Sequence, residues 1–122
     1  MENLRAAFEA YGADYDDTMR RFMGNEAMYL RVLGMLPRDG SAERLGGALD
    51  AGDLDGAFEA AHTLKGVSGN LGLAPLYKAV CALVEPLRLR EERDDYPELY
   101  RAVRGEFERA VLFLEALKGA LS

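Results

Sequence analysis

The last segment of the chain, from Tyr96 to Ala120, has apolar side chains at every third or fourth position. This stripe consists of Leu99, Val103, Phe107, Ala110, Leu114 and Leu117. Such spacing is typical of a long α-helix that buries one face. No segment shows the sustained alternation of apolar and polar residues that a half-buried strand requires. The long helix must therefore pack against other helices, and the sequence predicts an all-α fold.

Glycine, proline and aspartate residues divide the rest of the chain into shorter helical segments. We expect these helices at about residues 2–11, 14–23, 26–36, 42–51, 54–71 and 75–90. Asn25, Ser41 and Asp53 are suitable N-caps, and Gly72 is placed to end its helix in a left-handed conformation. Pro86 should kink the helix that contains it or end it early. Amphipathic helices with short connections predict an antiparallel four-helix bundle with short additional N-terminal helices.

The composition restricts the compartment and the partners. The 122 residues suit one domain over residues 1–122, and the formal net charge of −6 argues against binding to nucleic acid or to an anionic membrane. The single cysteine, Cys81, excludes an intrachain disulfide, and its apolar neighbours suggest that it is buried. The chain shows no signal peptide and no apolar run near the roughly 20 residues that span a bilayer. We expect a cytoplasmic protein, and a monomer because no further apolar stripe is left over.

The chain contains one histidine, His62, which excludes a multi-histidine metal site. At about 100° per residue, four neighbours share its face of the expected helix. That face comprises Phe58, His62, Lys65, Gly66 and Gly69. Leu64 and Leu71 fall on the opposite, apolar side. His62 should therefore point outward while the two leucines point into the core.

Two glycines on one helical face need a reason, because each costs up to about 1 kcal/mol relative to alanine. Without side chains at Gly66 and Gly69, a bulky partner can approach the imidazole. Lys65 would attract an anion carried by His62. An accessible imidazole is a competent nucleophile, so this face suits the acceptance of a phosphoryl group. The alternative is that His62 is a solvated helix residue without a role.

The run His62-Thr63-Leu64-Lys65-Gly66, followed by Gly69 and Leu71-Gly72, resembles the signature of histidine-containing phosphotransfer (HPt) domains of two-component phosphorelays. The resemblance extends to Ala61 before the histidine, to Gly52-Asp53 at the helix start, and to Arg21-Phe22-Met23-Gly24-Asn25 upstream. It covers most of the chain and is strongest over residues 12–117.

The resemblance implies a role for each matching residue. His62 would be the phosphoacceptor, Lys65 would stabilise the phosphohistidine, and Gly66 and Gly69 would leave room for the partner. The partners would be a response-regulator receiver domain, a hybrid histidine kinase, or both. The receiver would supply the metal ion, so the chain would need no metal or cofactor, and it would be a phosphotransfer intermediate without kinase activity of its own.

Phe58 is the less settled residue of this face. We expect it to be a partly exposed contact for a partner, or else to pack against the short N-terminal helices. Three other functions remain open from the sequence. The chain could be an interaction module that binds a receiver or kinase without accepting phosphate, or the phosphoacceptor domain of a larger sensor kinase. It could also be a small enzyme that uses His62 as a general base oriented by Glu59.

Overall fold

The computed structural model describes residues 2–121, and the side chains of residues 4–120. All regular elements in this part of the chain are helical, as predicted. They are α1 (Glu2–Tyr11), α2 (Tyr15–Arg21), α3 (Glu26–Leu33), the 3₁₀ turn η1 (Leu36–Arg38), α4 (Ser41–Asp50), α5 (Leu54–Asn70), α6 (Ala74–Arg88) and α7 (Tyr96–Leu121). None of the described helices is both long and apolar enough to cross a membrane.

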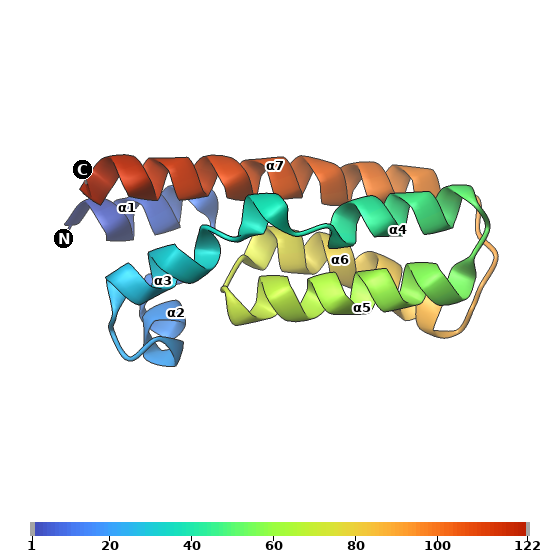
Figure 1. Ribbon diagram of the computed structural model, residues 1–122, viewed down its shortest axis with the longest axis horizontal. Helices are drawn as coiled ribbons and strands as arrows, with labels where there is room; N and C mark the ends of the chain where they lie inside the picture. The colour runs from blue at the N-terminus through green and yellow to red at the C-terminus, as the bar shows by residue number, and fades with distance from the viewer. Residues whose placement is uncertain (1, 122) are drawn as a thin grey trace.

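Helices α4 to α7 form the predicted antiparallel four-helix bundle (Figure 1). Helix α5 packs against α4 and α6, and α7 packs against α4 and α6 on the other side. The short N-terminal helices gather at one end of the bundle, where α1 lies along the C-terminal half of α7 (Figure 1). Helices α2 and α3 lie near the turn that joins α5 to α6.

The core is built from the apolar stripes that the sequence shows. On α7, five of the six stripe residues are buried, and Leu99 at the beginning of the helix is only partly buried. Leu64 is fully buried on α5, and Leu71 is 5% exposed just beyond its end. Cys81 on α6 is half-buried, so the expectation of a buried thiol was wrong.

Side-chain caps explain where α2, α3 and α5 begin. The Asn25 carboxamide accepts a hydrogen bond from the Met28 N–H, and the Asp53 carboxylate accepts one from the Gly56 N–H. Both were expected. The turn after α5 contains Gly72 with a φ of +68°, which is the predicted left-handed conformation.

The expected cap at Ser41 was wrong. Gly40 occupies the N-cap position of α4, and Ser41 is the first residue of the helix. The Asp39 carboxylate accepts a hydrogen bond from the Ser41 N–H at 2.8 Å and so satisfies one of the free donors of this helix end. The preceding helix also ends earlier than predicted, at Leu33, and the chain continues into the 3₁₀ turn η1. Pro37 in this turn has no N–H with which to continue the α-helical hydrogen bonds.

Pro86 lies inside α6, which ends two residues later at Arg88 rather than at Arg90. The chain then turns through a Schellman motif. The Glu91 N–H donates to the Pro86 carbonyl, and the Arg90 N–H donates to the Leu87 carbonyl, each at 3.0 Å. Arg90 adopts a φ of +54° at the position that glycine usually occupies in this motif.

Candidate functional site

His62 lies near the middle of α5, and its side chain is exposed to solvent. The helix is held against the bundle from behind by Ala61 and Leu64, both fully buried. Among residues 4–120, no side chain or backbone group forms a hydrogen bond or an ion pair with the imidazole. Both ring nitrogens are therefore free to react or to meet a partner.

Lys65 lies one turn further along the same face and is half-buried. Its ammonium group forms no ion pair with any carboxylate in the described part of the chain. Glu59, the carboxylate that could orient the imidazole of a general base, likewise forms no hydrogen bond or ion pair with His62. The Lys65 ammonium is thus a positive charge near His62 that no carboxylate of the described residues neutralises.

The two glycines of this face have different surroundings. A Cβ atom added to Gly66 would have no heavy atom within 4 Å outside its own helix, so the space above this residue is open. A Cβ atom at Gly69 would lie 3.2 Å from the ring of Tyr77 on α6. Tyr77 is 38% exposed, so a side chain at position 69 would press on this ring as well as on any partner.

Phe58 precedes His62 by one turn and is half-buried. Its ring is nearly parallel to the imidazole, with an interplanar angle of 21° and ring centroids 5.6 Å apart. The guanidinium carbons of Arg90 and Arg88 lie 4.7 and 5.4 Å from the Phe58 centroid. Helices α1 to α3 lie towards the other end of the bundle (Figure 1). The groups over Phe58 come instead from the end of α6 and the turn after it.

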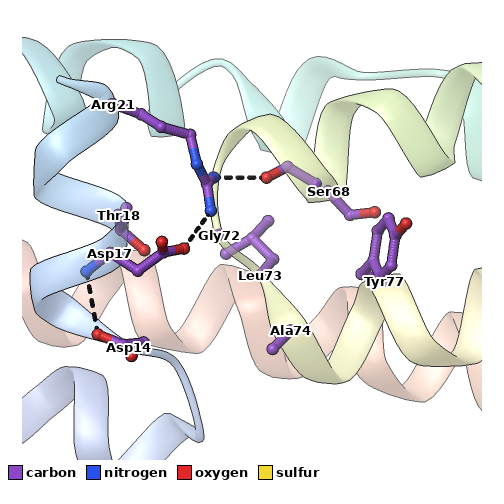
Figure 2. Close-up of a pocket in the computed structure, with 10 residues that line it drawn as sticks. Asp14, Asp17, Thr18, Arg21, Ser68, Gly72, Leu73, Ala74 and Tyr77 are labelled. Atoms are coloured by element: carbon purple, nitrogen blue, oxygen red, sulfur yellow. Dashed lines mark hydrogen bonds and ion pairs between the residues drawn. The ribbon is translucent and has the colours of Figure 1, made fainter.

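Arg21 fixes the far end of α5. Its Nη1 group donates to the carbonyls of Gly69 and Asn70, at 2.6 and 3.1 Å, and its Nη2 group donates to the Asp17 carboxylate (Figure 2). A cationic side chain at the C-terminal carbonyls of a helix satisfies free acceptors and complements the helix dipole. Arg21 lines a pocket of about 340 Å³ between α2 and the α5–α6 turn. In Figure 2, Arg21 and Tyr77 lie on opposite sides of this pocket.

The sequence model of the Hpt domain family matches residues 39–120, which is more than half of the chain. The chain belongs to the Hpt domain family. Hpt domains are phosphotransfer modules of two-component signalling, and they interact with receiver domains and histidine kinases. No curated protein and no solved structure matched the chain.

The match covers α4 to α7 and includes the whole His62 face. It begins at Asp39, so Arg21 and the four residues after it, on which part of the resemblance rested, lie outside the matched range. Of the predicted site residues, the structure places Phe58, His62 and Lys65 on one side of α5.

Three contacts of this Hpt domain were not predicted. Sequence reasoning did not find Tyr77 against Gly69, the helix cap supplied by Arg21, or the guanidinium of Arg90 over Phe58. Each joins α5 to another part of the chain, and helical periodicity within one segment carries no signal for such contacts. Among the residues described, no cluster of three or more potential metal ligands occurs.

Proposed function

We propose that the chain is a phosphocarrier, in which His62 accepts a phosphoryl group from a receiver-domain aspartate or a kinase and passes it on. The observation that carries this proposal is an exposed imidazole on the family-matched helix α5, with no hydrogen-bond or ion-pair partner among the described residues. The receiver or hybrid kinase would dock over this face. The proposal also places the protein in the cytoplasm and treats it as a monomer.

The transfer needs one nucleophile from this chain. A ring nitrogen of His62 uses its lone pair to attack the phosphorus of the acyl phosphate. As the N–P bond forms, the P–O bond to the aspartate breaks, and the aspartate carboxylate leaves with the bonding electrons. The proton on the other ring nitrogen stays on the phosphoimidazole or is released to water. Phosphoryl transfer depends mainly on positioning and charge stabilisation, which the partner's site would largely supply.

Lys65 would stabilise the product. Its ammonium group has no carboxylate partner in the described part of the chain, so it can pair with the phosphoryl oxygens without breaking an existing contact. Gly66 would give the partner's site access to the imidazole, supported by the open space above it. Gly69 would serve the same clearance together with its packing against Tyr77. The chain would need no cofactor and would have no kinase activity of its own.

Incubation with a receiver domain carrying a labelled aspartyl phosphate tests the proposal. The label should move to this chain, be labile to acid as phosphohistidine is, and be absent in His62→Gln. Because His62 is exposed, the variant should keep its far-UV circular dichroism spectrum and its affinity for the receiver. Retention of label in His62→Gln would refute the proposal. Stable binding without transfer from any receiver of the source organism would support an interaction module instead.

A further inference from the structure

A second aromatic ring restricts the imidazole of His62. The Phe58 and His62 rings are stacked within 21° of parallel, one turn apart on the same helix. Offset-stacked aromatic pairs of this kind have a preferred geometry. Rotation of the imidazole about its bond to the helix would break the stack. The stack therefore favours one orientation of the side chain that would react, and no group in the described part of the chain hydrogen-bonds either of its nitrogens.

Arg90 holds the other partner of this stack. Its guanidinium lies over the Phe58 ring, and it donates hydrogen bonds to the Asp55 carboxylate and to the carbonyls of Leu87 and Arg88. These groups belong to the first turn of α5 and the last turn of α6. Phe58 thus contacts both His62 and a guanidinium that is tied to two helices.

The backbone at Arg90, like that at Met23, has a positive φ. At Arg90 this conformation accompanies side-chain contacts to two helices. The residue adopts a φ of +54°, a conformation that is unfavourable for any residue with a Cβ atom. Glycine would satisfy the same Schellman motif without strain. Strained backbone persists where the surrounding contacts over-determine it, and such sites are often functional.

We propose that Phe58 is a positioning residue for phosphoryl transfer, and that Arg90 holds Phe58 in place. This inference rests on the proposed function of His62. Phe58 touches neither phosphate nor partner in this role. Its ring keeps the imidazole plane in the orientation in which a ring nitrogen faces the incoming phosphorus, which raises the fraction of encounters that can react.

The size of the effect follows from the stack. Stacked aromatic pairs contribute about a two- to tenfold change in an equilibrium constant, in addition to the effect of the area that they bury. This range follows from the conversion of about 1.4 kcal/mol per factor of ten. Loss of the Phe58 ring should therefore lower the rate of phosphorylation by about two- to tenfold.

Two phosphoryl donors separate positioning from docking. Phosphoramidate is small and needs no docking surface, whereas a phosphorylated receiver domain must bind before it transfers. Phe58→Leu keeps an apolar side chain of similar reach but removes the ring, and Phe58→Tyr keeps the ring. Positioning predicts that Phe58→Leu slows labelling by both donors. With the receiver, its maximal rate should fall while the half-saturating concentration is unchanged, and Phe58→Tyr should restore both rates.

A pure docking role predicts a different result. Phe58→Leu would then raise the half-saturating receiver concentration and leave the phosphoramidate rate at the wild-type value, and that result would overturn the positioning role. A wild-type chain that accepts no label from any receiver would refute the proposed function and this inference with it. Equal rates for wild type and Phe58→Leu with both donors would refute the positioning role alone.

Arg90→Gly tests the second half of the inference without endangering the fold, because glycine suits the left-handed backbone. The variant should unfold at the same or a higher urea concentration than the wild type, yet label more slowly with phosphoramidate. In one- and two-dimensional NMR spectra, the His62 ring proton shifts should move towards those of Phe58→Leu as the stack loosens. An unchanged rate and unchanged shifts in Arg90→Gly would show that Arg90 does not hold the stack.

Discussion

Replacement of Gly72 by alanine should destabilise the chain far more than the same replacement at Gly52. The two glycines have nearly identical φ values, +68° for Gly72 and +69° for Gly52. They differ in surroundings. A Cβ atom at Gly52 would meet no heavy atom within 4 Å, whereas one at Gly72 would overlap the Oγ1 atom of Thr18. Thr18 is 1% exposed and lies on α2, where it lines the pocket (Figure 2). Its hydroxyl lies beside Gly72 in the α5–α6 turn.

The left-handed conformation costs a residue with a Cβ atom about 1–2 kcal/mol, and this term applies to both variants. Overpacking against a buried group adds about 1–3 kcal/mol, and only Gly72→Ala carries this second term. We therefore expect Gly52→Ala to lower the free energy of unfolding by about 1–2 kcal/mol. For Gly72→Ala we expect a loss of about 2–5 kcal/mol, since both terms act together.

Urea unfolding followed by far-UV circular dichroism measures both changes, provided that the variants and the wild type have the same m-value. Thr18→Ala removes the overlapping hydroxyl, so the double variant should recover part of the loss caused by Gly72→Ala, as a double-mutant cycle would reveal. The reasoning would be refuted if Gly72→Ala and Gly52→Ala lost the same free energy. It would also be refuted if the cycle showed no coupling between positions 18 and 72.

Three further predictions concern the site and the core. Lys65→Ala should keep the wild-type urea midpoint and slow phosphorylation about tenfold, the equivalent of one charge-assisted contact, and an unchanged rate would contradict its role. Gly66→Leu should stabilise α5 by up to about 1 kcal/mol and reduce transfer from a receiver more than labelling by phosphoramidate; equal effects on both donors would contradict the clearance argument. Burial raises the pKa of Tyr11 from 10.0 to about 12 and also raises the pKa of Tyr29. Both phenols ionise at lower pH in the unfolded chain, so the free energy of unfolding should keep its full value below about pH 10 and fall between about pH 10 and 12. A free energy of unfolding from urea titrations that stays constant over this range would refute the prediction.

The helices could be predicted because their signals are local. The apolar stripe of α7 and the side-chain caps at Asn25 and Asp53 depend on residues within one or two turns of each other. Ser41 shows the limit of such reasoning. Two residues near the start of α4 have side chains that can accept from a free N–H, and the sequence does not say which one the backbone selects. The structure uses Asp39, which leaves Ser41 buried inside the first turn.

The same distinction applies to the candidate site. The outward face of α5 follows from the angle between successive residues of a helix, so an exposed His62 opposite a buried Leu64 could be predicted. The contacts that complete this face come from α6 and the turn after it, and they depend on how two helices pack.

Arg90 was especially hard to predict, because its conformation is one that sequence patterns assign to glycine. An arginine at such a position is unfavourable locally, and contacts to other parts of the chain can compensate for the cost. Its contacts to Asp55 and Phe58 supply that compensation. Arg90 has a backbone conformation that is unfavourable for arginine, and it joins two helices beside His62. Such a conflict between local preference and structure is expected at functional sites, so it points to the site more directly than a residue in its preferred conformation does.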